Sequence, residues 1–324
     1  MYKVYISDSF NPYFNLAFEE YLVKTADIND TILFLWQNDH TVVIGRNQNP
    51  WKECDLSQLK KSGGNLIRRS SGGGAVYHDL GNLNYTFISH FKEHTLRSNI
   101  EIILKSLNRS EICAYFSGKN DILVKDTKIS GNAFFVENET FCHHGTLLIH
   151  TDKEKLAQYL TVSKQKLASK GLDSVQSRVV NLKELNKDIT VEKVKTSLLE
   201  IFLSKELNLN VIHVSEALTQ EAMVSDLMKK YESWEWNYGS SPQFDLQLTE
   251  RFPWGEVELN LRIEDGIVKE VKLYSDAMDV DFPGRIEGAV KNIRFEKNAF
   301  IKAVEGLEYE NGADIIFMIA SMEF

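Results

Sequence analysis

The chain has 324 residues, of which 43% are hydrophobic and 26% are charged, and its formal net charge is −9. This composition predicts a globular protein of one or two domains, and the acidic balance argues against bulk binding of nucleic acid, which needs a basic face. We expect a cytoplasmic protein, because the N-terminus lacks a signal-peptide pattern, no run of about 18 apolar residues predicts a membrane span, and the three cysteines lie far apart.

Hydrophobic periodicity predicts helices and strands in alternation over the first third of the chain. Apolar side chains recur at helical spacing from Pro12, and Asn11 is a suitable cap for that helix. Residues 31–36 and 40–45 are apolar and β-branched, and their short polar connection predicts a hairpin. The other elements expected here are a helix over 51–61 opened by Asn49-Pro50, strands at 65–69, 75–77 and 84–89, and a helix at 100–108.

The rest of the chain separates into two parts. Strands are expected at 121–124, 128–136 and 146–150, followed by helices from residue 152 onward. Gly, Ser and Pro interrupt this pattern within residues 234–244, so we place a domain boundary after residue 245. Beyond it, Asp265-Gly266 between two alternating runs predicts a hairpin, and helices are expected near 282–293 and 312–324.

The segment RRSSGGGAVYHD combines paired arginines, a glycine triplet and a histidine. Gly72, Gly73 and Gly74 let the backbone come close to another group because they carry no Cβ. The segment is neither a P-loop nor a dinucleotide fingerprint, since no Lys-Ser or Lys-Thr follows and the next residues predict a strand. With Arg69 suited to a phosphate or carboxylate, we interpret it as a loop between strands whose amides contact a ligand. The alternatives are a plain glycine-rich turn and a structural role for His78.

A second polar cluster surrounds Lys128, which follows a tight turn and begins a strand. A lysine that faces a cleft from an apolar sheet can act as a fixed cation on phosphate or carboxylate oxygens, although most lysines are solvated surface residues. Lys125, across the turn, is the better candidate for a surface role. Asp121 precedes the same turn and is either a magnesium ligand beside phosphates or a structural residue, in a turn or as a strand cap.

Residues 142–150, CHHGTLLIH, bring a thiol next to two histidines. If the segment is a strand, His143 and His144 point to opposite faces, so at most one of them faces a given site. Cys142 is a candidate nucleophile for an acyl group, but its apolar surroundings favour a buried and inert thiol.

Residues 166–182 form a polar, basic segment in an otherwise acidic chain, with Lys166, Lys170 and Arg178. The segment is either a solvated connection or a loop that contacts a ligand or an acidic partner.

Together these motifs resemble the bacterial lipoate–protein ligases over almost the whole chain. The resemblance weakens in the C-terminal domain. It implies an α+β fold, with a large domain of mixed β-sheets flanked by helices (biotin/lipoate ligase-like) at 1–245 and a small C-terminal α+β accessory domain at 246–324. The segments that carry it are, in family order, NLAFEEY, VVIGRNQNPWKEC, RRSSGGGAVYHDLGN, GKNDI, KISGNA, HHGTLL, KGLDSVQSRVVNL and WEWNYG.

The resemblance implies that lipoate and ATP, with Mg²⁺, give lipoyl-AMP and pyrophosphate, and that the lipoyl group then passes to one lysine of a lipoyl domain. Lys128 is implied to contact both lipoate and ATP, and Asp121 to lie near the phosphates and the metal. The other implied substrate-binding residues are Arg69, Gly72, Gly73, Gly74, Ala75, Val76, Tyr77 and His78, of which Arg69 and 74–77 match ATP contacts and 72–78 line the acyl tunnel.

The implied acceptors are the lipoyl domains of 2-oxoacid dehydrogenase E2 subunits and the glycine cleavage H protein. We expect a monomer that binds neither nucleic acid nor membrane. Since lipoyl domains are typically acidic, as this chain is, transfer calls for a local basic rim, and Lys170 and Arg178 are the residues we expect in this nucleotide or partner loop, with Lys164 and Lys166 beside them.

Three alternatives stay open at this point. An octanoyl or lipoyl transferase would carry the acyl group on Cys142 and need no ATP, but such transferases generally lack the C-terminal domain. A non-catalytic lipoyl- or nucleotide-binding protein is disfavoured, because every expected ligand position is filled. A biotin ligase on a similar scaffold is the most distant alternative.

Overall fold

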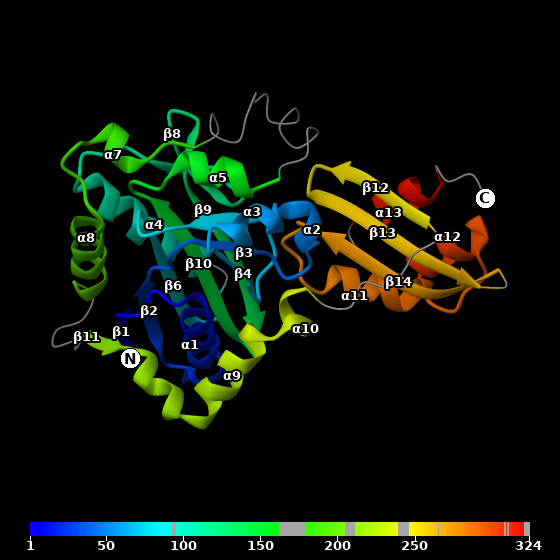
Figure 1. Cartoon of the computed structure of the whole chain (residues 1–324), viewed down its shortest axis with the longest axis horizontal. Coiled ribbons are helices and arrows are strands. Elements are labelled where there is room, and N and C mark those ends of the chain that lie inside the picture. The colour runs from blue at the N-terminus through cyan, green and yellow to red at the C-terminus, as the bar shows by residue number, and fades with distance from the viewer. Residues whose placement is uncertain are drawn as a thin grey trace. The chain divides into compact units, whose positions relative to one another are not determined.

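The computed structural model describes residues 1–92, 95–161, 179–204, 211–238, 246–264, 266–307, 309 and 311–320. The chain divides into two compact units (Figure 1). The first contains residues 1–44, 50–70 and 75–237, and the second combines 45–49 and 71–74 with 238–324. Within the described ranges, no helix is long and apolar enough to cross a membrane.

An eight-stranded mixed sheet forms the framework of the first unit. Its order is β11-β1-β2-β6-β10-β9-β8-β7. β1 pairs in parallel with β2 and β11, and every other pair is antiparallel, which confirms the predicted α+β class. The strands are β1 (Tyr2–Ser7), β2 (Thr31–Trp36), β6 (Asn82–His90), β7 (Tyr115–Phe116), β8 (Asp121–Val124), β9 (Thr127–Glu137), β10 (Thr140–Leu148) and β11 (Val211–Val214).

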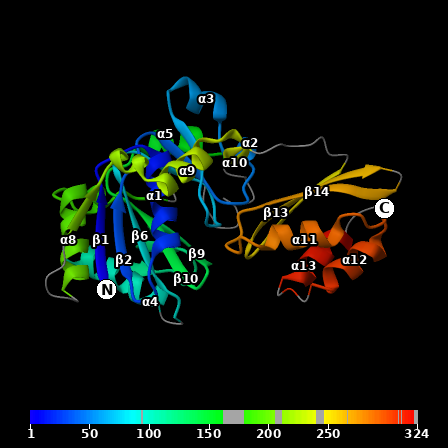
Figure 2. The same ribbon diagram turned by 90° about the horizontal axis from the view of Figure 1, so that it is seen from below.

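Helices cover both faces of this sheet (Figure 2). On one face, α4 and α8 pack through Ile103 and Phe202 against Phe87 of β6. On the other, α1 and α9 enclose a core that contains Phe18 and Ile88. Because Phe87 and Ile88 are neighbours in β6, strand alternation places one in each core. The described helices of this unit are α1 (Pro12–Thr25), α2 (Pro50–Glu53), α3 (Leu56–Lys61), α4 (Thr95–Asn108), α5 (Lys153–Tyr159), α7 (Leu182–Leu185), α8 (Val191–Leu203), η2 (Glu216–Gln220), α9 (Ala222–Glu232) and α10 (Trp234–Asn237).

The predicted start of α1 is confirmed, but the predicted hairpin at 31–45 is wrong. Asn11 caps α1 by accepting from the Tyr13 amide at 2.9 Å. Both expected strands exist, yet β2 lies in the large sheet and β3 (Thr41–Ile44) lies in a separate sheet of order β4-β3-β5. The polar connection is anchored to α1, since Asn15 donates to the Gln37 carbonyl at 2.8 Å, so it leads the chain away from β2. The partners of β3 are β4 (Asn65–Arg68) and β5 (Val76–His78).

Two other predicted elements have different bounds. The helix expected over 51–61 is divided into α2 (Pro50–Glu53) and α3 (Leu56–Lys61), because Asp55 starts a new helix by accepting from the Gln58 amide. The strand expected at 146–150 is β10, which runs over 140–148. Asn138 and Glu139 have φ values of 48° and 67°, so they form a two-residue turn that pairs β10 with β9 from its first residue.

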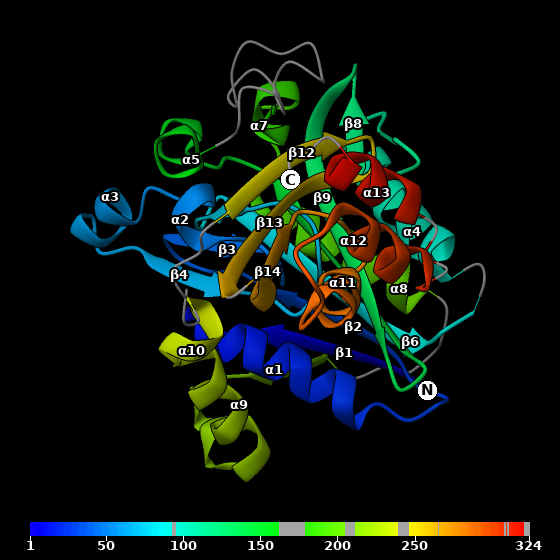
Figure 3. The ribbon, with the colours of Figure 1, turned by 90° about the vertical axis from the view of Figure 1, so that its right-hand side faces the viewer.

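The second unit is a three-stranded antiparallel sheet with helices packed on one face (Figure 3). The hairpin predicted around Gly266 is confirmed, and that glycine has a φ of +71°. Leu259 and Leu273 of the sheet share a core with Phe282 and Phe300 of the helices. The elements are β12 (Leu246–Phe252), β13 (Gly255–Glu264), β14 (Ile267–Ser275), α11 (Phe282–Val290), α12 (Lys297–Glu305) and α13 (Gly312–Ala320).

Candidate functional site

Lys128 and Asp121 form an ion pair across the β8–β9 hairpin. The Lys128 Nζ lies 2.7 Å from Asp121 Oδ1, and the two side chains are only 15% and 10% exposed. The pairing of β8 with β9 shifts between Ile122 and Leu123, so that β9 carries one extra residue after Lys128. Such a bulge redirects side chains, and bulges are common next to active sites. Lys128 is therefore a partly buried, fixed cation and not a solvated lysine.

The Lys128 side chain lies across Gly131 of the same strand. A Cβ added at Gly131 would lie 2.8 Å from Lys128 Nζ and 3.1 Å from its Cε. The absence of a side chain at residue 131 is therefore what lets the ammonium group lie against the sheet. Gly131 also donates its amide to Thr146 Oγ1 on β10 at 3.2 Å.

Strand register places a row of polar side chains beside this ammonium group. Thr146 of β10 lies opposite Asn84 of β6, and His144 lies opposite Thr86. Directly paired and alternate residues share one face of a sheet, so all four side chains lie on the face that Gly131 opens. All four are at least 90% buried. A molecule whose carboxylate is held by Lys128 would therefore extend along this buried polar row.

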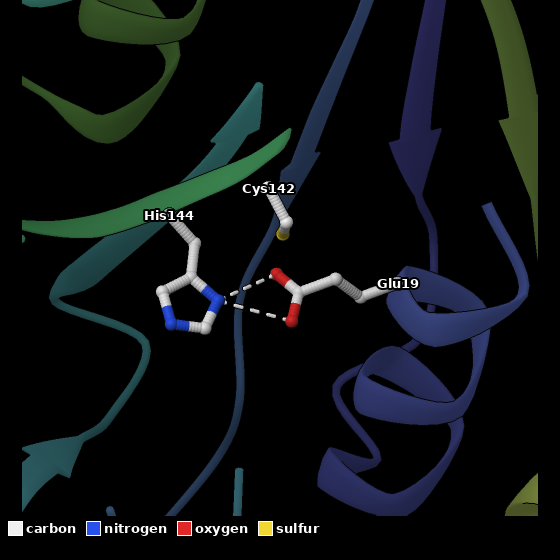
Figure 4. Close-up of side chains that lie close together, drawn as sticks. All are labelled: Glu19, Cys142 and His144. Atoms are coloured by element: carbon white, nitrogen blue, oxygen red, sulfur yellow. Dashed lines mark hydrogen bonds and ion pairs between the residues drawn. The ribbon is translucent and has the colours of Figure 1, made fainter. Parts of the chain in front are cut away.

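At the far end of the row, His144 contacts a carboxylate from α1 (Figure 4). Its Nδ1 lies 2.9 and 3.0 Å from the two carboxylate oxygens of Glu19. Thr86 donates to the same carboxylate at 2.6 Å, and Trp36 donates to Thr86 at 3.0 Å. Sequence reasoning did not select Glu19. Its only signal is a charged residue within an apolar stretch of the first helix, most of whose residues are buried.

Cys142 lies next to Glu19 and His144, and its thiol is fully buried. Among the described residues, they are the one group of three His, Cys, Asp or Glu side chains whose potential metal-ligand atoms all lie within 4.8 Å of one another. Burial, followed by the charges of Glu19 and Glu137, raises the pKa of the Cys142 thiol well above its usual range. A thiol held in its neutral form is a poor nucleophile, which supports the inert interpretation.

The two adjacent histidines of β10 point to opposite faces of the sheet. His144 faces Glu19, whereas His143 lies in the other layer, with its Nε2 2.9 Å from Asn132 Oδ1. Burial, followed by the charge of His144, lowers the pKa of His143 to about 3. Only His144 therefore belongs to the polar row.

Arg69 follows β4 and is buried. Its guanidinium donates to the Val43 carbonyl at 3.3 Å. Burial lowers the pKa of Arg69 to about 10, while the charge of Glu19 opposes this change. Arg69 therefore stays positively charged at neutral pH, within the electrostatic range of the carboxylate that holds His144.

His78, at the end of β5, is also buried. Asn38 and Asn84 direct their side-chain amide nitrogens at its Nδ1, at 3.3 and 3.5 Å. Burial, then the charges of Arg69 and His144, lowers the pKa of His78 to about 3. His78 is therefore neutral and belongs to the same polar layer as Arg69 and His144.

The other predicted positions of the glycine segment differ in their surroundings. Ala75 and Val76 are half-buried, and Tyr77 is buried with its hydroxyl 3.4 Å from His40 Nδ1. Residues 71–74 belong to the second unit, where Gly73 donates its amide to the Ala277 carbonyl at 3.2 Å. A Cβ on Gly72 would lie 2.5 Å from that carbonyl oxygen. In this structure, the group that the glycine triplet approaches closely is therefore protein backbone.

The basic segment predicted to form the partner loop is described only from Val179 onward. Lys164, Lys166, Lys170 and Arg178 all lie outside the described residues. Described structure resumes at Val179, which bridges Lys128, and the Val180 amide donates to the Lys128 carbonyl at 3.0 Å. The C-terminal end of the basic segment is therefore hydrogen-bonded to the backbone of Lys128, the candidate catalytic lysine.

Both parts of the chain match known proteins. Residues 11–203 match the family model of the lipoyl protein ligase A/B catalytic domain, and residues 241–317 match that of the bacterial lipoate protein ligase C-terminus. A lipoate-protein ligase A of Blochmanniella floridana is 41% identical over 284 residues, which are 86% of this chain and 84% of the relative.

Two solved structures are similar as well. LipL1 of P. falciparum in complex with lipoate is 31% identical, with a TM-score of 0.88 over 99% of this chain and 100% of its own. A lipoate-protein ligase A bound with ATP is 27% identical, with a TM-score of 0.63 over 74% of this chain and 99% of its own.

Proposed function

Because the chain belongs to the lipoate–protein ligase family, we propose that it joins lipoate to ATP as lipoyl-AMP, releases pyrophosphate, and transfers the lipoyl group to a lysine of a lipoyl domain. The observation that carries this proposal is the fixed Lys128 cation at one end of a buried polar row. Lipoate has one anionic end and one apolar end. A cation held at a fixed position suits the anionic end of such a molecule.

Lys128 supplies charge stabilisation in the adenylation step. A carboxylate oxygen must approach the α-phosphorus while both groups are negative, and pyrophosphate must leave from the opposite side. An ammonium group fixed at the junction lowers the repulsion and stabilises the charge that develops on the phosphate. The ion pair with Asp121 holds the ammonium in place before substrate arrives, so little reorganisation is needed during the reaction.

Arg69 and residues 74–77 are proposed to contact ATP, and Gly72 and Gly73 to line the acyl tunnel, as the resemblance implies. The permanent charge of Arg69 supports this assignment, since a buried guanidinium suits an anionic group. Asp121 supplies a carboxylate oxygen, which fits a Mg²⁺ ion that is held mainly by phosphate oxygens and water. Such an ion would neutralise phosphate charge when bound with the nucleotide.

Loss of the Cys142 thiol should leave activity almost unchanged. In a Cys142→Ser variant we expect lipoate-dependent pyrophosphate release within about threefold of wild type, because the buried, neutral thiol acts as a small apolar side chain. The measurement is coupled pyrophosphate detection with purified proteins. Loss of all acyl transfer in this variant, together with transfer by the wild type without ATP, would instead establish the transferase.

The proposed function is tested by mixing the protein with lipoate and α-labelled ATP. We expect lipoyl-AMP and pyrophosphate in equal amounts, and lipoylation of an added E2 lipoyl domain or H protein on one lysine. Omission of lipoate or of Mg²⁺ should remove both products. Binding of lipoate without any adenylate would contradict the ligase assignment and favour a non-catalytic binding protein.

Charge reversal in the basic segment should separate the two half-reactions. We propose that Lys170 and Arg178 contact an acidic lipoyl domain, so that Lys170→Glu with Arg178→Glu slows lipoyl transfer about tenfold or more at low salt. Formation of lipoyl-AMP should stay near the wild-type rate. Lys187→Glu with Lys193→Glu, at two exposed positions outside the basic segment, is a control of the same charge change. Equal loss in both half-reactions would show that these residues do not act on the acceptor.

A further inference from the structure

The segment WEWNYG is a motif of the family resemblance to which the proposed mechanism gives no role. Its first four residues form α10, which lies beside the end of β4 in the first unit (Figure 3). β4 is the outermost strand of its three-stranded sheet, and Arg68 is its last residue. α10 therefore meets the chain directly before Arg69, the residue proposed to contact ATP.

Side chains of α10 occupy the hydrogen-bonding positions that a neighbouring strand would fill. The Arg68 amide donates to Asn237 Oδ1 at 2.8 Å, and the Arg68 carbonyl accepts from Trp236 Nε1 at 2.8 Å. On the inner side of the strand, the Arg69 amide donates to the Ile44 carbonyl of β3 at 3.0 Å. The peptide group that joins the two arginines is therefore held from both sides, by α10 and by β3.

The Arg68 side chain is directed back at α10. Its Nε donates to the Trp236 carbonyl and its Nη2 to the Asn237 carbonyl, both at 2.9 Å. Consecutive side chains of an extended chain point to opposite sides, so the same geometry directs Arg69 towards the polar layer. The two adjacent arginines therefore have different roles, Arg68 as an anchor and Arg69 as the candidate ligand contact.

Asn237 is itself held rigidly. It is 2% exposed, and its Nδ2 donates to the carbonyls of Tyr231 and Ser233, at 2.6 and 3.0 Å. Carbonyl oxygens can only accept, so the amide nitrogen must face them and the amide oxygen must face Arg68. One buried side chain thus connects α9 and α10 to the end of β4.

The residue after Arg69 is held by α9. The Ser70 hydroxyl lies 3.0 Å from the Tyr231 hydroxyl, which donates to Glu20 Oε2 at 2.7 Å. The Lys230 ammonium lies 2.6 Å from the same oxygen. Burial raises the pKa of Glu20, but the hydrogen bonds from Lys230 and Tyr231 outweigh it and lower that pKa below its usual range. The chain is therefore fixed on both sides of Arg69.

We propose that Asn237 and Trp236 are positioning residues for nucleotide binding, and that they act by holding Arg68 so that the Arg69 guanidinium meets ATP in the correct orientation. This inference rests on the proposed function, in which Arg69 contacts ATP. A guanidinium binds phosphate through a planar fork of donors, so the contact depends on direction as well as charge. A shift of the Arg69 backbone should therefore weaken it although the charge remains.

The main test measures the affinity of Asn237→Ala for ATP, by calorimetry with Mg²⁺ and without lipoate. We expect it to fall about 10-fold, since a hydrogen bond between charged groups is weakened. The affinity for lipoate without nucleotide should change by less than about threefold. Wild-type affinity for ATP in the folded variant would overturn the proposal. Equal losses for both ligands would overturn it as well, because they would indicate a general loosening of the site.

A double-mutant cycle tests whether the effect passes through Arg69. In an Arg69→Gln protein, Asn237→Ala should lower the affinity for ATP by less than about twofold further, because the contact that it misplaces is gone. Losses that multiply would refute the proposed route.

Trp236→Phe is a milder variant for the case that Asn237→Ala does not fold. It removes the donor to the Arg68 carbonyl and keeps an aromatic ring beside the Lys230 ammonium, which lies 3.9 Å from the Trp236 ring centre. We expect ATP to bind about fivefold more weakly, again with little change for lipoate. An unchanged affinity for ATP would count against the proposal.

Asn186→Ala is the matched control. The Asn186 side chain also connects backbone groups, since it donates to the Ser110 carbonyl and accepts from the Asp188 amide, both at 3.0 Å. Its loss should lower the melting temperature and change the affinity for ATP by less than about threefold. A drop as large as that of Asn237→Ala would show that any lost backbone contact has this effect, and the proposal would fail.

The last measurement observes Arg69 without any ligand, in protein labelled with ¹⁵N-arginine. The buried guanidinium should give an Nε–H signal, assigned with Arg69→Gln, that shifts or broadens in Asn237→Ala and stays unchanged in Asn186→Ala. An unchanged signal in Asn237→Ala would overturn the proposal. If the wild type and Asn237→Ala bind ATP equally well, the inference fails while the ligase stands. If the wild type binds no ATP, the proposed function fails, and the spectrum still shows whether Asn237 positions Arg69.

Discussion

Lys128→Ala is expected to slow formation of lipoyl-AMP by about 10²–10³-fold, the effect of removing one fixed oxyanion donor. The ammonium lies against Gly131 and is paired with Asp121, so the substitution removes a cation that is held at one position. The measurement is single-turnover pyrophosphate release with saturating lipoate and ATP. Because the charge acts on the reacting oxygens, the loss should appear in kcat more than in the KM for lipoate.

Lys125→Ala serves as the control for this experiment. Lys125 lies three positions earlier, on the exposed turn between β8 and β9, and has a φ of +47°. Its replacement removes the same charge from the same hairpin and should leave the rate near that of the wild type. Adenylation at near wild-type rate by Lys128→Ala would show that the assignment of Lys128 is wrong, whatever the control does.

Local sequence predicted the elements of this fold better than their partners. The strands at 31–36 and 41–44 were both predicted, but their pairing was not. A hairpin is the default for two strands joined by a short polar connection. Here Asn15, on a helix that precedes both strands, binds that connection and sends the second strand to another sheet. Periodicity is measured over neighbouring residues, and Asn15 lies too far before the two strands to enter that comparison.

The same limit applies to the candidate site. Lys128 and Asp121 could be selected from sequence because each stands beside a turn, but their ion pair depends on a bulge that no pattern shows. Glu19 could not be selected, since a charged residue inside an apolar helical segment has no partner until the strands are placed. The pair His143 and His144 shows what can be predicted, because strand alternation alone assigns them to opposite faces.

The roles of glycine in this chain also become distinct only in the structure. The triplet at 72–74 attracts attention because it is contiguous. Gly131 and Gly145 are single residues within strands, where a glycine usually indicates a bulge or a close approach. Gly145 makes room for the ring of Tyr85, and a Cβ there would lie 2.8 Å from the Gly131 carbonyl oxygen. Gly131 makes room for the end of a flexible lysine, so the two positions should respond differently to the same substitution.

Gly131→Ala is expected to reduce adenylation about 100-fold while the protein stays folded. The added Cβ would be too close to Lys128 Nζ and Cε, at 2.8 and 3.1 Å, whereas Thr146 Oγ1 at 3.9 Å is an ordinary contact. The end of a lysine can move aside at little cost to stability. A displacement of about 1 Å at a reacting group can lower a rate by about 10². The measurements are pyrophosphate release and the melting temperature. Gly145→Ala is the comparison, since its Cβ would meet a rigid ring and backbone and should lower the melting temperature.

A double-mutant cycle shows whether this loss passes through the ammonium group. If Gly131→Ala acts by displacing Lys128, it should have almost no further effect in a Lys128→Ala protein, because the group it displaces is gone. The residual rates of Lys128→Ala and of the double variant should then agree within about threefold. Losses that multiply would mean that Gly131 affects the reaction by another route, such as the hydrogen bond from its amide to Thr146. In that case the position of Lys128 over Gly131 would be incidental to catalysis.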